Sequence, residues 1–175
     1  MSGHNKWSQI RRQKEKTDGQ KSKVFGKFAK LIAAEARKAN GDRNSPELRA
    51  VIERAKAENM PNDNMERAIK KATDNSAVME TITYEAYGPG GCAMIIEALT
   101  DNRNKAAQEI KFILGKHGFA LAGIGAASWA FVKEGMVWKP TTTIPLEEAD
   151  LELLGKLVEE LEENDEVQEV FTNAE

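Results

Sequence analysis

Nine of the first thirty residues of this chain are lysine or arginine, the side chains that proteins use to neutralise phosphate groups. Residues 1–71 carry 18 Lys and Arg against 9 Asp and Glu, whereas residues 72–175 carry 7 against 19. The formal net charge of −3 is therefore the balance of a basic and an acidic part. This asymmetry indicates that the basic end meets a polyanion, although two solvated faces of opposite sign would give the same counts.

The basic residues are spaced in a way that suits attraction to a phosphate backbone, and their spacing implies no readout of bases. Trp7 lies among them and has two interpretations. It stacks on a base, a contact worth about 1–3 kcal/mol, or it fastens the N-terminal segment to the helices that follow. The neighbouring His4 is assigned no role. The candidates for phosphate contacts are Lys6, Arg11, Arg12, Lys14, Lys16, Lys21, Lys23, Lys27, Lys30 and Arg37.

A glycine cluster, "GPGG" at residues 88–91, resembles a phosphate-binding loop at first sight. Such a loop needs backbone N–H groups that converge at the start of a helix. Pro89 has no N–H, and the segment after the cluster is strand-like. We therefore predict a turn between two strands.

The polar stretch "TDNRNK" at residues 100–105 stands where a strand hands over to a helix, and it has two interpretations. In the first, Thr100 or Asp101 only caps the helix. In the second, Arg103 and Lys105 form an anion site beside the helix N-terminus, where the dipole and free N–H groups favour negative charge. The sequence leaves both open.

The sequence gives little support to a metal site or a catalytic site. His4, His117 and Cys92 have no metal-ligand spacing, and Cys92 lies in a predicted buried strand, where a thiol is usually a small apolar side chain. No Ser/His/Asp set has a recognisable spacing. We expect no catalytic residue, metal or cofactor, and a protein that is not an enzyme; an enzyme with an unrecognised site is the least favoured alternative.

The basic part is predicted to form three short helices. Apolar residues recur at i, i+3, i+4 and i+7 from Val24 to Ala36, with lysines and an arginine on the opposite face. Ser45 and Pro46 form a helix start. Asp63 and Glu66 fit a capping box for the third helix. We expect a three-helix bundle-like domain.

Beyond "TDNSAVME" the spacing of the apolar residues is no longer helical. This change predicts a domain boundary there and two domains, residues 1–77 and 80–175. The second domain is predicted to be α+β, a two-layer antiparallel sheet with helices on one face, ferredoxin-like. Two helices are predicted in this domain. The first begins after residue 102 and ends at Gly118, and the second runs from about Glu147 to Glu162. Its strands are "TITYEAY", "CAMIIEAL", "SWAFVK", "TTTIPL" and "EVQEVFTN".

The strands "SWAFVK" and "TTTIPL" are expected in one sheet, joined by a short connection after Gly135. Pro140 and Pro145 donate no ladder hydrogen bond, so the second strand belongs at an edge or a strand end. The last helix is expected to share a core with the preceding one. The residues of that core are Leu151, Leu154, Val158 and Leu161 with Ile110, Ile113 and Leu114.

Four stretches together resemble the YebC/PmpR family, which is related to the mitochondrial translational activator of cytochrome c oxidase subunit I. They are "SGHNKW" at 2–7, "NMPNDNMERAIKK" at 59–71, "YEAYGPGGCAMIIEALTDNRNK" at 84–105 and "SWAFVKEG" at 128–135. The chain departs from the family after Gly135, where an inserted third subdomain is missing.

The resemblance implies a cytoplasmic regulator of gene expression. The first interpretation is a transcriptional regulator that binds DNA; the alternative is a ribosome-associated translation factor that binds ribosomal or messenger RNA. We find no helix-turn-helix spacing and no coiled-coil heptads, which argues against operator binding and favours a monomer. No apolar run reaches the 18 to 20 residues, roughly, of a membrane span, so we expect no membrane partner.

Overall fold

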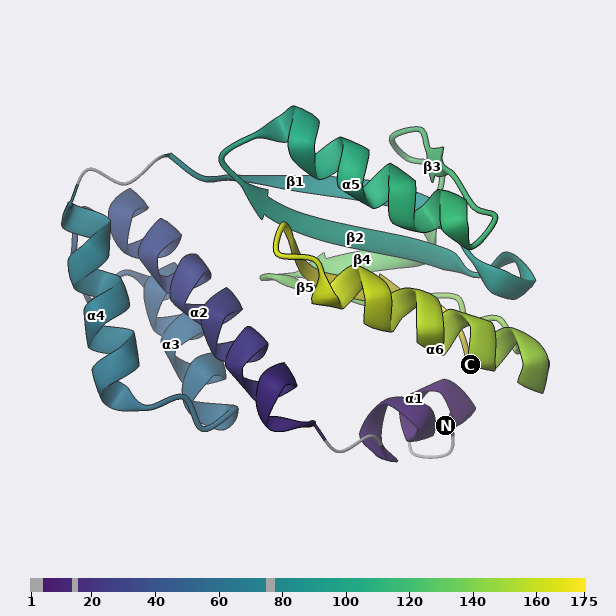
Figure 1. The fold of residues 1–175 in the computed structure, drawn as a ribbon, viewed down its shortest axis with the longest axis horizontal. Coiled ribbons are helices and arrows are strands. Elements are labelled where there is room, and N and C mark those ends of the chain that lie inside the picture. The colour runs from purple at the N-terminus through teal and green to yellow at the C-terminus, as the bar shows by residue number, and fades with distance from the viewer. Residues whose placement is uncertain (1–4, 14–15, 75–77) are drawn as a thin grey trace. The chain divides into compact units, whose positions relative to one another are not determined.

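The computed structural model describes residues 5–13, 16–74 and 78–175, which divide into two compact units. The helical unit is Lys16–Glu80, and the sheet unit is α1 (Lys6–Gln13) together with Thr81–Glu175 (Figure 1). The helical unit contains α2 (Asp18–Lys38), α3 (Pro46–Ala57) and α4 (Asn62–Thr73).

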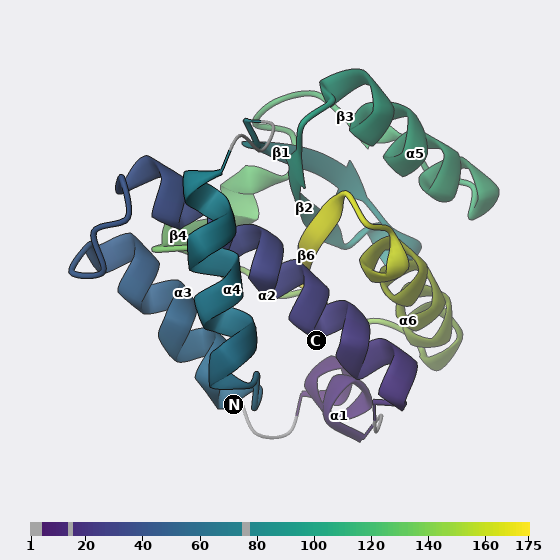
Figure 2. The ribbon, with the colours of Figure 1, turned by 60° about the vertical axis from the view of Figure 1, so that its left-hand side comes forward.

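In the helical unit, α2 packs against both other helices, and the prediction of three helices is confirmed (Figure 2). The predicted apolar stripe of α2 is fully buried only in its C-terminal half, at Ile32 and Ala36, whereas Phe25 and Phe28 are half-buried. The buried residues from α3 and α4 are Leu48, Val51, Ala55, Met65, Ala68, Ile69 and Ala72. The N-terminal half of α2 thus keeps apolar side chains partly open to solvent.

The helix starts confirm one prediction and correct another. Ser45 accepts a hydrogen bond from the Leu48 N–H at 3.5 Å, with proline in the first turn, as predicted. The predicted capping box at the start of α4 is wrong, because Pro61 stands at the N-cap and no side chain caps the helix there. Glu66 binds Arg43 instead, through two hydrogen bonds of 2.6 and 2.5 Å.

The sheet unit is α+β, with α5 and α6 on one face of a four-stranded sheet, and the predicted fold class is confirmed (Figure 1). The strand order is β3-β1-β2-β6, and the elements of this sheet follow one another along the chain as β-β-α-β-α-β, whereas a ferredoxin-like chain runs β-α-β-β-α-β. The elements are β1 (Glu80–Tyr87), β2 (Ala93–Thr100), α5 (Arg103–Lys116), β3 (Leu121–Ala122), α6 (Glu148–Glu163) and β6 (Val167–Thr172).

Strand β2 is buried along its whole length, since both of its faces are covered. Met94, Ile96 and Ala98 point into the core that α5 and α6 complete. Ala93 and Ile95 point to the opposite face of the strand and belong to a second core. The prediction that the two helices share a core is confirmed; its residues include Ile110, Ile113, Leu114, Leu151, Leu154, Val158 and Leu161. The "GPGG" cluster forms the predicted turn between β1 and β2, with Gly90 at a φ of 69°.

The second core lies under a separate two-stranded sheet, and here the predicted pairing is wrong. Strand β4 (Phe131–Glu134) pairs with β5 (Val137–Pro140), so "TTTIPL" is not the partner of "SWAFVK". Gly135, at a φ of 62°, permits a tighter hairpin than we expected. Ile144 makes only an isolated bridge to Ala174, and Pro140 ends its strand as predicted.

The N-terminal segment forms a helix, α1, that the sequence did not predict. Asn5 caps it by accepting the Ser8 N–H at 2.9 Å. Trp7 packs against the core of the sheet unit, and Arg11 forms an ion pair of 2.6 Å with Glu162 of α6. Trp7 therefore fastens this segment to the sheet unit rather than to the three helices.

Helix α5 is capped by Asn102, whose side chain accepts the Lys105 N–H at 3.1 Å. The prediction of Thr100 or Asp101 as the cap is wrong. The Thr100 hydroxyl bonds the backbone of Asn102 instead, and Asp101 is exposed. At the other end the helix stops before Gly118, whose φ is 84°, as predicted.

Glu85 of β1 holds the segment that leads into the hairpin. Its buried carboxylate accepts the N–H groups of Gly125, Ala127 and Ser128 at 2.7, 2.9 and 2.6 Å. Burial raises the pKa of this carboxyl, but the three backbone bonds more than offset that effect, so the pKa of Glu85 lies below its ordinary value.

We expect Glu85→Gln to lower the free energy of unfolding by about 1.5–3 kcal/mol at neutral pH, because hydrogen bonds to a charged acceptor are lost. Since the folded pKa is depressed, the native stabilisation is present above about pH 4.3 and is lost as the pH falls through the lowered pKa. Urea denaturation at neutral and acidic pH measures both effects. The exposed Glu152→Gln is the control, and an equal loss in both variants would contradict the role of Glu85.

The cap of α5 gives a second test. Asn102→Ala is expected to lower the free energy of unfolding by about 0.5–2 kcal/mol, because a helix N–H loses its acceptor. Asp101→Ala, one residue earlier and exposed, is expected to change it by less than about 0.5 kcal/mol. Thermal unfolding of both variants checks this, and a larger effect of Asp101→Ala would show that the cap is assigned to the wrong residue.

Candidate nucleic-acid interface

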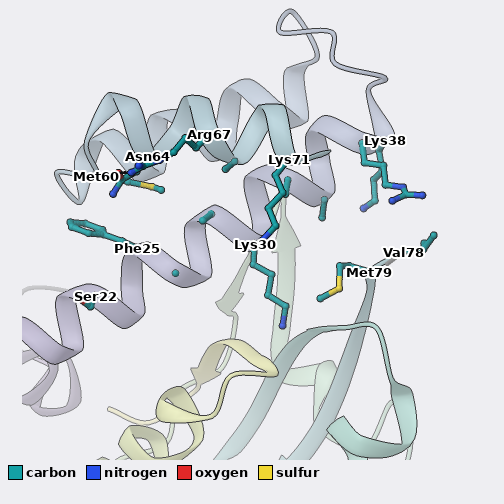
Figure 3. A pocket seen from close by; sticks show the side chains of 16 residues that line it. Ser22, Phe25, Lys30, Lys38, Met60, Asn64, Arg67, Lys71, Val78 and Met79 are labelled. Carbon is teal, nitrogen blue, oxygen red and sulfur yellow. Dashed lines mark hydrogen bonds between the residues drawn. The ribbon is translucent and has the colours of Figure 1, made fainter. Parts of the chain in front are cut away.

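A groove of about 880 Å³ runs between α2 and α4 within the helical unit (Figure 3). The residues that line it recur every three or four positions on each helix, so one face of α2 meets one face of α4. From α2 and its surroundings they are Ser22, Phe25, Gly26, Ala29, Lys30, Ala33, Ala34, Arg37 and Lys38. From α4 and the segments beside it they are Met60, Asn64, Arg67, Ala68, Lys71, Val78 and Met79.

Five of these residues are cations, namely Lys30, Arg37, Lys38, Arg67 and Lys71. Among the described residues that line the groove, none is acidic. Lys38 bonds Glu35 at 3.1 Å and Arg67 bonds the Asn64 side chain, so two of the cations have their positions fixed. Like charges gathered along a concave surface raise the local positive potential and attract anions.

Apart from its cations and the polar Ser22 and Asn64, the groove is lined by apolar residues. Small residues of α2, Gly26, Ala29 and Ala33, keep it open, and a Cβ placed on Gly26 would meet no atom within 4 Å. Phe25 and Met60 line one end of it (Figure 3). The groove therefore offers both electrostatic attraction and an apolar surface to a ligand.

The sequence predicted part of this cationic set. Lys30 and Arg37 line the groove, while Lys23 and Lys27 lie on α2 outside its lining. Lys16 and Lys21 also belong to the helical unit without lining the groove, and Lys16 pairs with Glu58 at 3.3 Å. Lys38, Arg67 and Lys71 also line the groove and were not predicted from the sequence. A signal was present in "NMERAIKK", where Asn64, Arg67 and Lys71 share one helical face.

The other predicted phosphate contacts lie elsewhere. Lys6 and Arg11 belong to α1 in the sheet unit, where Arg11 is paired with Glu162 and lies 5.7 Å from the centre of the Trp7 ring. The Arg12 side chain and Lys14 lie outside the described residues. The basic residues of the N-terminal region that the structure describes are thus divided between the two units.

The second predicted site, at the start of α5, contains a carboxylate. The Lys105 ammonium lies 3.1 Å from the buried Glu166, and the hydrogen bond to that carboxylate raises the pKa of Lys105. Arg103 is the first residue of the helix. An anion bound at this N-terminus would therefore be repelled by the Glu166 carboxylate, which already pairs with Lys105, one of the two proposed cations.

The residues considered for other chemistry have structural partners. Burial raises the pKa of the Cys92 thiol to about 11, so it is protonated at neutral pH and is a poor nucleophile. His117 bonds Glu160 at 2.6 Å. Within residues 5–13, 16–74 and 78–175, no group of three or more His, Cys, Asp or Glu side chains is placed to hold a metal ion. None of the helices described is both long and apolar enough to cross a membrane.

Comparisons with known proteins cover nearly the whole chain. The model of the TACO1/YebC protein N-terminal domain matches residues 5–75, and the model of the TACO1/YebC second and third domain matches 79–138 and 132–174. A "Probable transcriptional regulatory protein" of Thermoanaerobacter pseudethanolicus is 35% identical over 239 positions, covering 100% of this chain and 97% of the relative. Another, from Petrotoga mobilis, is 43% identical over 98% of this chain and 70% of its own length.

The crystal structure of a conserved hypothetical protein from Aquifex aeolicus has a similar fold, with a TM-score of 0.81, 30% identity, and coverage of 97% of this chain and 96% of that one. The 175-residue chain is shorter than the 239-position alignment with its Thermoanaerobacter relative. The two matches to the second and third domains meet at the β4–β5 hairpin, where we predicted the missing subdomain. The chain belongs to the TACO1/YebC family, in a form that lacks the inserted subdomain.

Proposed function

We propose that this protein is a cytoplasmic, non-enzymatic regulator of gene expression that binds nucleic acid through the groove between α2 and α4. The observation that carries the proposal is the meeting of five cations from two helices along one groove, without an acidic residue among the described lining. Lysine and arginine neutralise phosphates and supply most of the sequence-independent affinity for nucleic acid.

The relatives support the regulatory part of the proposal, since those compared are named probable transcriptional regulatory proteins. The charge distribution supports the choice of surface. We proposed domains of residues 1–77 and 80–175, and we now propose that Lys16–Glu80 alone carries the binding, because α1 belongs to the sheet unit. Both DNA in transcription and RNA on the ribosome fit a surface dominated by phosphate contacts.

The cations of α4 give the direct test. Arg67→Ala/Lys71→Ala is expected to weaken binding to every nucleic-acid sequence and to lower the slope of log affinity against log salt, by about 0.9 per lost phosphate contact on a duplex or about 0.7 on a single strand. Both side chains are exposed on a helix, where alanine is well tolerated. Fluorescence anisotropy titrations at several salt concentrations measure the effect.

The matched control is Lys111→Ala/Lys156→Ala, which removes the same charge from exposed positions of the sheet unit. We expect this control to bind nearly as the native chain does. Equal weakening by the two double variants would show that only the net charge matters, and that the groove is not the binding surface.

The start of α5 gives a separate prediction. Because Lys105 is paired with Glu166, we expect Arg103→Ala to leave nucleic-acid affinity unchanged within experimental error. The same titration measures it, together with thermal unfolding to check that the variant is folded. A clear loss of affinity at an unchanged melting temperature would restore the anion site that the sequence left open.

A further inference from the structure

The groove between α2 and α4 has an apolar floor that phosphate contacts do not require. Besides its cations and the polar Ser22 and Asn64, it is lined by apolar residues that include Phe25, Met60, Met79 and several alanines. Phe25 is only half-buried, although exposing part of an aromatic ring to water is unfavourable. A ligand that carries both phosphates and flat apolar groups would use the cations and the floor together.

A duplex does not fit this description. Its bases are stacked inside, and proteins that read it place a projecting helix or strand in its major groove. Here α2 and α4 flank a hollow of about 880 Å³ instead of presenting a ridge. A duplex would touch the cationic rims and leave the apolar floor unused.

A single strand does fit. Its unstacked bases can leave the backbone, stack on aromatic side chains and enter pockets while the phosphates contact cations. The volume lies within the range of about 300–1,000 Å³ found for pockets that enclose small ligands, a class that includes single bases. In Figure 3 the Lys71 side chain points from α4 toward α2, across the floor.

We propose that the groove is a base-accepting site for single-stranded nucleic acid. An unstacked base lies on the floor against Phe25 and Met60, and the flanking phosphates contact Lys30, Arg67 and Lys71. This inference rests on the proposed function, since it assigns a ligand class to the same groove. RNA and single-stranded DNA share this chemistry.

The test compares three ligands of the same length: a single strand, the same strand with abasic sites in place of its bases, and a duplex. The abasic strand keeps every phosphate, so only the floor distinguishes it from the natural strand. We expect the native protein to bind the natural strand about 5- to 150-fold more tightly than the abasic strand. Fluorescence anisotropy with labelled ligands measures all three affinities.

Two variants change the floor without touching a cation. Phe25→Ala removes the stacking surface, and Gly26→Leu fills space that is empty in the native groove while replacing a helix-interior glycine with a better helix former. Both are expected to remove the preference for the natural over the abasic strand and to leave abasic binding unchanged. Gly115→Leu, at an equally open glycine of α5, is the control and should keep the preference.

The outcomes separate this inference from the proposed function. If the native protein binds abasic strand and duplex as tightly as the natural strand, while Arg67→Ala/Lys71→Ala still weakens all three, the base site is wrong and the cationic interface stands. If that double variant binds all three ligands as the native chain does, both proposals are wrong. Binding of an acidic amphipathic peptide, with no binding of any strand, would also overturn both. A comparison of RNA and single-stranded DNA of the same sequence then identifies which of the two is the ligand. Tighter binding of the RNA strand shows that a 2′-hydroxyl is recognised.

Discussion

The sheet unit depends on the burial of β2 on both of its faces. A strand with eight buried residues has no side for water, so each face must be covered by another layer. Helices α5 and α6 cover one face with leucines and isoleucines, and the β4–β5 hairpin covers the other with Phe131 and Trp138. Three backbone N–H groups donate hydrogen bonds to Glu85 and hold the chain that leads into this hairpin. The buried carboxylate therefore helps to position the apolar residues that cover β2.

This requirement explains how the chain can be shorter than its relatives. The two matches to the second and third domains overlap at residues 132–138, within the hairpin, and Phe131 and Trp138, which cover β2, lie on its paired strands. Removing a subdomain at the turn therefore leaves the cover of β2 in place.

The features that were predicted from the sequence are those that depend on neighbouring residues. The periods of α2, α3 and α6 and the Ser45–Pro46 start are local patterns, because one face of one element decides them. The α5 cap was missed by one position, since Thr100, Asp101 and Asn102 are all acceptable caps and only the strand end decides among them. The partner of β4 was missed because β5, Val137–Pro140, is only four residues long, too short for its alternation to stand out in the sequence.

The candidate site was also predicted only in part, because its position depends on how the helices pack. Counting charges along the chain located the basic part, but Arg11 is held by Glu162, and an exposed ion pair of this kind contributes only about 0–1 kcal/mol. The packing of Trp7 against the core is the larger contribution to the placement of α1, and an apolar contact thus decides where that basic segment lies. The groove exists only because α2 and α4 pack together, and its lining joins residues as far apart as Ser22 and Met79. A cationic surface is a property of packed helices, so the richest basic stretch of a sequence and the strongest cationic groove of its fold need not coincide.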